Sequence, residues 1–148
     1  RREIPMPPPE LIHTGTMAVH LSANSYFIPD GPLGTRVVAE VDKVTIEGDR
    51  LNATMVGHAA ADWLTVSPDR SFGDLDVRIT FQTDDDVLVY CTYGGRIDLA
   101  KGRAVATPLF QTGDERYDWL VRAQFLADGT RDPETNVLTY ELYEVRLA

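Results

Sequence analysis

The sequence predicts an all-β protein of about eight to ten short strands, arranged as an antiparallel barrel or a sandwich. Three observations support this prediction. Apolar and polar residues alternate with a period of two, Gly, Pro and Asp recur between the alternating runs, and no long amphipathic helix is present. Because no helix can cover the apolar faces of the strands, these faces must cover one another. Closing the sheet on itself achieves this and removes exposed strand edges, so a closed barrel is favoured.

The chain is expected to begin with a Pro-rich extended segment, residues 1–9, followed by a single domain, residues 10–148. The first strand is predicted at residues 10–21. Its apolar face is expected to carry Leu11, His13, Met17, Val19 and Leu21.

Two hairpins are predicted in the middle of the chain, each made of two alternating runs around a polar turn. They are residues 35–48 with 50–56 across Gly48-Asp49, and residues 74–83 with 87–93 across Asp84-Asp85-Asp86. Two more strands are predicted near the end, at residues 119–127 and 137–147, joined by a polar turn. Residues 96–104 are the only segment whose pattern is compatible with a helical turn.

Composition excludes several classes of protein. The chain has 148 residues with 23 acidic and 14 basic side chains, and its formal net charge of −9 disfavours nucleic acid and anionic membranes as partners. No apolar run is long enough to span a bilayer, and the single Cys91 allows no intramolecular disulfide. The three histidines match no metal motif, so neither a metal nor another cofactor is expected. These features favour a cytoplasmic protein with no nucleic-acid or membrane partner.

The strongest candidate for chemistry lies in VGHAAADWLTV, residues 56–66. If this stretch ends in a strand, Asp62 shares a face with Leu64, while Trp63 points the other way. An aspartate on an apolar face has a raised pKa unless it is paired, and such a carboxyl suits a general acid or base. The alternative is that Asp62 caps its own turn.

Two histidines are candidate partners for Asp62. His58 lies four residues earlier and would be oriented by the carboxylate if the two meet; the alternative is a histidine in a surface loop. His13 lies between Leu11 and Met17 on the apolar face of the first predicted strand, where its alternative is a core residue with a satisfied side chain.

Tyrosine, tryptophan and arginine side chains complete the predicted pocket. A phenol hydroxyl can donate a hydrogen bond to a developing enolate, and a guanidinium offers a planar fork for a carbonyl group or an anion. The alternatives are ring packing and cross-strand ion pairs on the outer wall. Tyr93 joins the predicted catalytic set, and the predicted substrate-binding residues are Trp63, Arg36, Trp119, Tyr140 and Arg122.

Five segments follow one another in a recognisable order: EGDRL (47–51), ADW (61–63), LDVRITFQTDD (75–85), PLFQTGDERYDWL (108–120) and YELYEV (140–145). In this order and spacing they resemble the DUF3237 (UPF0311) family over nearly the whole chain. The resemblance implies a small, closed, calycin-like antiparallel barrel with a central pocket. The chain departs from the family pattern at Lys43-Val44, where a Gly-Gly pair is usual, and at His58, in a region that is usually rich in glycine. These departures indicate a specialised member.

The predicted function is a cofactor-free enzyme that uses acid/base chemistry in the barrel pocket. Its substrate would be an aromatic or polyketide-like carbonyl compound, and the reaction a cyclisation, an isomerisation or a lyase/dehydratase step. One alternative is a barrel that carries or senses a small apolar ligand without chemistry, and another is an assembly domain with a filled interior. A homodimer is left open.

Overall fold

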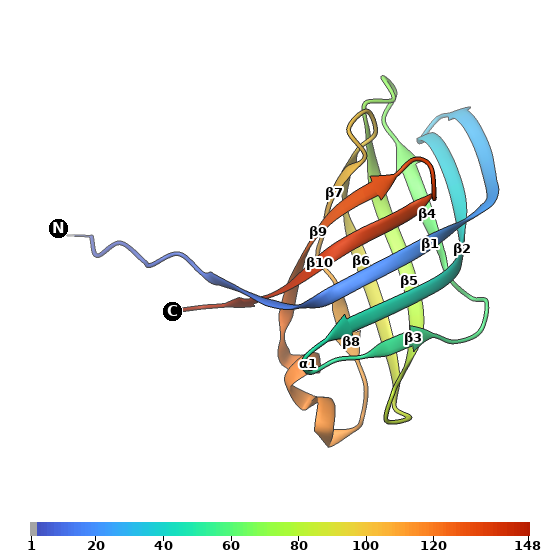
Figure 1. The fold of residues 1–148 in the computed structure, drawn as a ribbon. Coiled ribbons are helices and arrows are strands. Elements are labelled where there is room, and N and C mark those ends of the chain that lie inside the picture. The colour runs from blue at the N-terminus through green and yellow to red at the C-terminus, as the bar shows by residue number, and fades with distance from the viewer. Residues whose placement is uncertain (1–2) are drawn as a thin grey trace.

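The computed structural model describes residues 3–148, whose regular structure is an antiparallel sheet of ten strands with one short helical segment (Figure 1). Residues 3–9 are exposed and have no regular structure, and the first two residues of the predicted N-terminal segment lie outside the described residues. The strands are β1 (Glu10–Gly31), β2 (Gly34–Gly48), β3 (Ala53–Met55), β4 (Ala61–Val66), β5 (Phe72–Thr83), β6 (Leu88–Asp98), β7 (Arg103–Ala106), β8 (Leu109–Gln111), β9 (Gln124–Asp132) and β10 (Val137–Arg146). The helical segment is a 3₁₀ turn, η1 (Glu115–Tyr117), followed by α1 (Asp118–Arg122).

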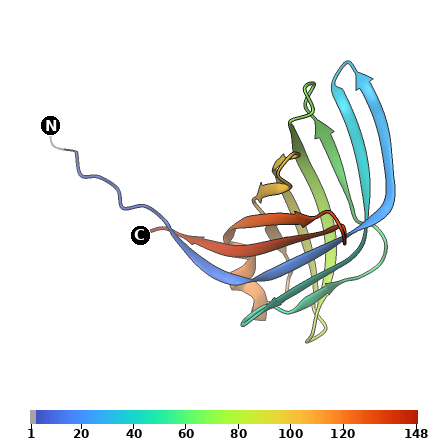
Figure 2. The same ribbon diagram turned by 45° about the horizontal axis from the view of Figure 1, so that its top comes forward.

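The strands pair in the order β3-β5-β4-β2-β1-β10-β9-β7-β6-β8, and β3 also pairs with β2. A further ladder joins β5 to β6, from Phe72 opposite Asp98 to Gln82 opposite Leu88. This ladder brings strands from the two ends of the order together, so the sheet curves around an interior (Figure 2). Both predicted hairpins are present, as β2 with β3 and as β5 with β6.

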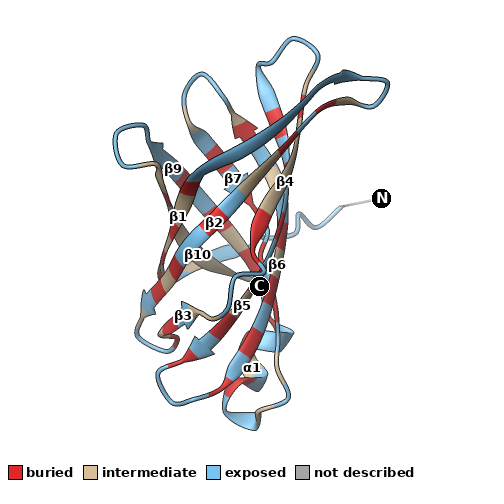
Figure 3. Ribbon diagram, turned by 90° about the vertical axis from the view of Figure 1, so that its right-hand side faces the viewer, coloured by how far each residue is buried: buried red, intermediate tan, exposed pale blue. Residues whose placement is uncertain are grey.

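Buried and exposed residues alternate along the strands (Figure 3). On β5 the buried side chains include Leu75, Val77, Ile79 and Phe81, with polar residues between them. The period-two pattern of the sequence therefore identifies the inward face of this strand correctly.

The helical segment α1 lies at the lower end of the sheet in Figure 1. Large buried side chains pack in the interior near it. Ile79, Phe81, Phe110, Phe125 and Leu120 are buried there, and the rings of Phe110 and Phe125 meet edge to face at 5.2 Å. Packing of this kind excludes water and gives the sheet a conventional hydrophobic core.

The predicted strand at residues 119–127 is wrong in its first half, because residues 118–122 form α1 and β9 begins at Gln124. Tyr117, Leu120 and Ala123 are buried at a spacing of three residues, which suits a helical turn and not a strand. The preceding Asp114 accepts the backbone N–H of Arg116 and so caps the 3₁₀ turn.

The helical turn that the sequence allows at residues 96–104 does not form, since β6 runs to Asp98 and a tight turn leads into β7. Asp98 accepts the backbone N–H of Lys101, and Gly102 adopts a positive φ of 62°. A glycine in the left-handed region suits a β-turn, so this segment forms a hairpin.

The first strand differs from its prediction because of a β-bulge. His13 pairs with Tyr143, but the next recorded pair is Gly15 with Leu142, so Thr14 is an extra residue on β1. A bulge shifts the alternation of faces, and Leu11 and His13 are therefore exposed while Met17 is buried.

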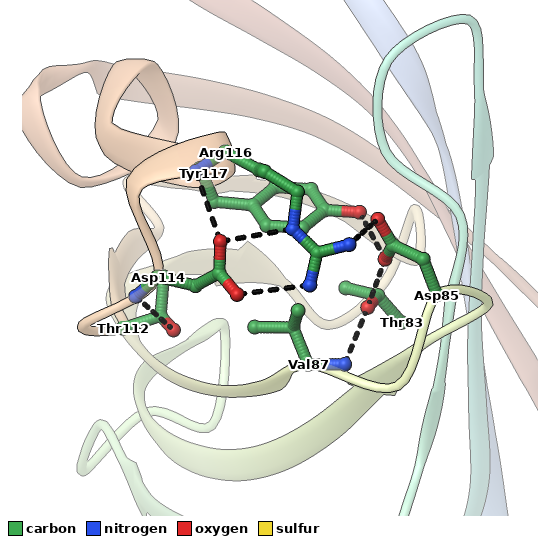
Figure 4. A network of polar contacts seen from close by, with 7 residues as sticks. All are labelled: Thr83, Asp85, Val87, Thr112, Asp114, Arg116 and Tyr117. Carbon is green, nitrogen blue, oxygen red and sulfur yellow. Dashed lines mark hydrogen bonds and ion pairs between the residues drawn. The ribbon is translucent and has the colours of Figure 1, made fainter.

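A polar cluster ties the β5–β6 turn to the helical segment at the lower end of the sheet (Figure 4). Asp85 accepts hydrogen bonds from the hydroxyls of Tyr117 at 2.6 Å and Thr83 at 2.5 Å, and its other oxygen lies 3.2 Å from Arg116 Nη1. Arg116 also pairs with Asp114 at 2.9 Å. The Thr83 hydroxyl, followed by the Tyr117 hydroxyl, lowers the pKa of Asp85 below its usual value.

Candidate functional site

The upper half of the interior is not filled and holds a cavity of about 320 Å³. This volume lies at the lower end of the range of roughly 300–1,000 Å³ that is usual for small-molecule sites. Its lining reaches Gly102 in the β6–β7 turn and Asn136 in the β9–β10 turn. Small side chains at Ser22, Ala23, Ser25 and Ala39 leave room that large residues occupy in the lower half. Its apolar wall consists mainly of Val19, Leu21, Phe27, Val41, Leu64, Leu75, Val77, Ile97, Leu99 and Leu138.

Asp62 on β4 places a carboxyl group in this apolar wall. The recorded β4–β5 pairs skip two positions between Asp62–Val77 and Thr65–Asp74, and Asp62 Oδ1 accepts the Asp76 N–H at 3.0 Å within this gap. Its other oxygen, Oδ2, has no hydrogen bond to any residue in the range 3–148. One oxygen therefore fixes the carboxyl group, and the second is free to contact a ligand.

Burial raises the pKa of Asp62 from its ordinary value of 3.8 to about 6. The Asp76 N–H opposes this rise, as does the more distant Arg36, while the charges of Asp76 and Asp74 add to it. A carboxyl group with a pKa near 6 is present in both protonation states at slightly acid pH, as a general acid or base requires.

Tyr93 on β6 and Tyr140 on β10 line the same cavity, with ring centroids 5.6 Å apart in an edge-to-face arrangement. Burial raises the pKa of both phenols, and the nearby charge of Asp62 adds to the rise at each of them. The two hydroxyl groups influence each other's pKa, but the Tyr140 hydroxyl has no partner with hydrogen-bond geometry within residues 3–148. Both tyrosines are thus neutral hydrogen-bond donors, and the Tyr140 hydroxyl is buried with its donor unused among residues 3–148.

The ring of Tyr140 is positioned by close contact with β9. A Cβ atom at Gly129 would lie 2.5 Å from Tyr140 Cε1 and 2.7 Å from Cδ1, so the absence of a side chain at Gly129 makes room for the ring. Gly129 on β9 and Tyr140 on β10 are directly opposite each other in the antiparallel ladder.

The structure brings together three of the residues that the sequence predicts for the site. Asp62, Tyr93 and Tyr140 all line the cavity, from three strands that are far apart in the sequence. The prediction that Asp62 faces inward is confirmed, since Leu64 lines the cavity with it.

Neither predicted histidine partner accompanies Asp62. His58 is exposed in a bend before β4, and within residues 3–148 it forms no hydrogen bond or ion pair with Asp62. An i, i+4 contact would need a helix, whereas this segment leads into an extended strand. His13 lies on the outer wall as a result of the bulge, 2.6 Å from Glu141 and edge to face with Tyr143.

The four remaining predicted residues lie outside the cavity. Trp63 points away from it beneath Arg78, whose guanidinium carbon is 5.6 Å from the ring centroid, and Arg36 donates to the Trp63 carbonyl at 2.8 Å. Trp119 packs against the core from α1, with Arg50 3.7 Å above its ring. Arg122 is exposed and pairs with Asp118 at 2.7 Å. The predicted pocket wall of Trp63 and Trp119 is therefore corrected to one of aliphatic side chains, Phe27 and two tyrosines.

Sequence reasoning missed Arg131 and Asn136, which lie at the mouth of the cavity. Between the last two strands the sequence predicts only a polar turn. A signal was present, because Arg131 continues the inward-facing series of Phe125, Ala127 and Gly129 by one more step of two residues.

Three further findings concern the part of the chain that the structure describes. No helix there is long and apolar enough to cross a membrane. No three His, Cys, Asp or Glu side chains converge there as a metal site would require. Cys91 is buried in the core, as the sequence predicts, and burial raises the pKa of its thiol.

Comparison with known proteins decides the family. A family described as "Protein of unknown function (DUF3237)" matches residues 9–145. The chain belongs to the DUF3237 family. No curated protein matches the chain with significance.

Solved structures share the fold of this DUF3237 member. A β-barrel-like protein from Acinetobacter baumannii is 23% identical with a TM-score of 0.84, over 98% of this chain and 100% of the other. A conserved protein of unknown function from Rhodopseudomonas palustris is 20% identical with a TM-score of 0.84, over 94% and 99%. A protein from Penicillium herquei, called an enzyme, is 20% identical with a TM-score of 0.73, over 99% and 100%. At these identities the likeness concerns the fold, which is barrel-like in agreement with the all-β prediction.

Proposed function

We propose that this protein is a cofactor-free enzyme that moves protons on an aromatic or polyketide-like carbonyl compound bound in the cavity. The observation that supports this proposal most strongly is the Oδ2 atom of Asp62, which has no hydrogen bond within residues 3–148. It belongs to a carboxyl group with a pKa of about 6, in an apolar cavity that two neutral tyrosines also line. Cyclisation, isomerisation and elimination of water each need two groups. One is a base that takes a proton, and the other is a hydrogen-bond donor that stabilises the resulting oxyanion.

In the proposed reaction, Asp62 Oδ2 removes a proton from the substrate and returns it at another position. The Tyr93 hydroxyl donates a hydrogen bond to the substrate carbonyl and stabilises the developing enolate, with the ring of Tyr140 beside it. The aliphatic wall holds the ring body and keeps water from the reacting atoms. The proposed scaffold is a closed calycin-like barrel, which the β5–β6 ladder between the two ends of the strand order supports.

The name given to the Penicillium herquei protein agrees with an enzymatic role on this fold. A second candidate is a binding barrel without chemistry. It is favoured by the hydrogen bond from the Asp76 N–H to Asp62, which gives the carboxylate a structural role in the interrupted β4–β5 ladder.

Deuterium exchange separates the two candidates without knowledge of the natural substrate. The probe is 2-tetralone, an aromatic ketone with acidic C–H groups, incubated with the protein in D₂O and followed by proton NMR. We expect the wild type to accelerate exchange, Asp62→Asn to lose about 100-fold or more of that rate, and the rate to rise as pH passes about 6.

The matched control is Asp42→Asn, which removes an exposed carboxylate on β2 and should exchange at the wild-type rate. Equal rates for wild type and Asp62→Asn would overturn the enzymatic proposal. Saturable binding of 2-tetralone with no exchange above buffer would support the binding barrel in its place.

A further inference from the structure

Arg131 lies at the end of β9, exposed to solvent yet bordering the cavity. It is the one arginine among residues 3–148 that lines this cavity. The half-buried Asp62 contributes a negative charge deeper in the same space, so the cavity has charges of opposite sign at its two ends.

The guanidinium of Arg131 is held in place by Asn136. Its Nε and Nη2 atoms both donate to Asn136 Oδ1, at 3.1 and 2.9 Å. Asn136 is itself fixed, because its backbone adopts a left-handed φ of 59° and its amide nitrogen donates to the carbonyls of Leu21 and Ser22 at 3.4 Å. A side chain oriented in this way loses less conformational entropy when it binds a ligand.

Arg131 has no anionic partner in the described part of the chain. Most other arginines there are engaged by carboxylates or rings, as with Arg96 on Asp74 and Arg50 on Trp119. Asn136 is a neutral acceptor and uses two of the five N–H donors, so the positive charge and three donors remain available.

We propose that Arg131 binds the carboxylate group of the ligand at the cavity mouth, so that the substrate class is an aromatic carboxylic acid whose apolar body extends towards Asp62. This inference rests on the proposed function, because it describes the ligand of the same cavity. A planar carboxylate matches the donor fork of a guanidinium, and the charge of Asp62 repels a carboxylate from the deep end. The two charges together orient an amphiphilic ligand in one direction.

The test is isothermal titration calorimetry at about pH 8, where the probes and the carboxylates of the protein are ionised. The probes are three aromatic carboxylates of one, two and three rings, each matched with its methyl ketone: benzoate, 2-naphthoate and 9-anthroate against acetophenone, 2-acetylnaphthalene and 9-acetylanthracene. The wild type is expected to bind at least one carboxylate about 10- to 100-fold more tightly than its ketone.

Arg131→Met is expected to abolish this preference by weakening the carboxylate alone. Arg122→Met is the matched control, since it removes an exposed arginine remote from the cavity and should leave both affinities unchanged. Two results would overturn the role of Arg131 and leave the proposed function of the cavity unaffected. One is equal wild-type affinity for the carboxylate and the ketone of each pair, and the other is an equal loss of affinity for both in Arg131→Met. If the wild type binds none of the six probes, the anchor and the proposed ligand cavity both fail.

Discussion

Replacement of Asp62 by Asn should stabilise the protein at neutral pH, although it removes the proposed catalytic group. The carboxyl is half-buried in an apolar wall, and its pKa rises from 3.8 to about 6 because the folded state disfavours the charge. Each pKa unit corresponds to about 1.4 kcal/mol, so ionised Asp62 costs the fold at most about 3 kcal/mol. An asparagine carries no charge, and its Oδ1 can still accept the Asp76 N–H.

The size of this stabilisation depends on pH. Because the folded pKa is the higher one, the folded state binds the proton more tightly, and the stability that this provides is complete below pH 3.8 and lost as pH rises through about 6. The advantage of Asp62→Asn should therefore be near zero at about pH 3.5 and reach its plateau above about pH 7.

Urea unfolding of both proteins at a series of pH values measures this difference. The exposed Asp42→Asn serves as the control, and its difference from the wild type should stay flat with pH. A variant that is less stable than the wild type at neutral pH, or whose advantage does not change with pH, would refute the assignment of Asp62 as a carboxyl destabilised by burial.

Three further variants test the surroundings of the site and the lower end of the sheet. Tyr140→Phe should raise the free energy of unfolding by about 1 kcal/mol, because it removes a buried hydroxyl without a partner; a loss of stability in urea would contradict this. Gly129→Ala should lower it by about 1–3 kcal/mol and alter the near-ultraviolet circular dichroism of the tyrosines, because its Cβ would overlap the Tyr140 ring; an unchanged unfolding curve would count against the contact. Tyr117→Phe should lower the urea midpoint at neutral pH, because Asp85 loses a donor. The gap should close below pH 3.8, where the stability from the lowered pKa of Asp85 is lost, so a gap independent of pH would argue against this bond.

The sequence predicts most of the sheet because burial on one face leaves a period of two that can be followed residue by residue. The alternation from Leu75 to Phe81 is an example, and it places the inward face of β5 correctly. The errors occur where a local device interrupts the period. The extra residue Thr14 turns His13 outward, and the capped turn after Asp114 produces a helix where a strand is predicted.

The candidate site is predicted in part for a similar reason. Asp62 and Tyr93 follow from the facing rule on regular strands, and the structure places both on the cavity. The site residues come together from strands that are distant in sequence. No pattern within one segment specifies that they meet. Arg131 was missed because it follows Gly129 at a strand end, where sequence reasoning expected only a turn.

The distribution of unfavourable features is the strongest argument that the upper cavity is functional. In the lower half, large side chains such as Phe81 and Leu120 are fully buried in the core. In the upper half, the chain combines an unfilled volume, a carboxyl with a raised pKa at Asp62 and an unpaired buried hydroxyl at Tyr140. Each of these features lowers the stability of the fold. A protein that needed only a core could fill the volume with larger side chains and carry apolar residues in place of Asp62 and Tyr140. Local departures of this kind concentrate where function opposes stability, and here they face one another across a single cavity.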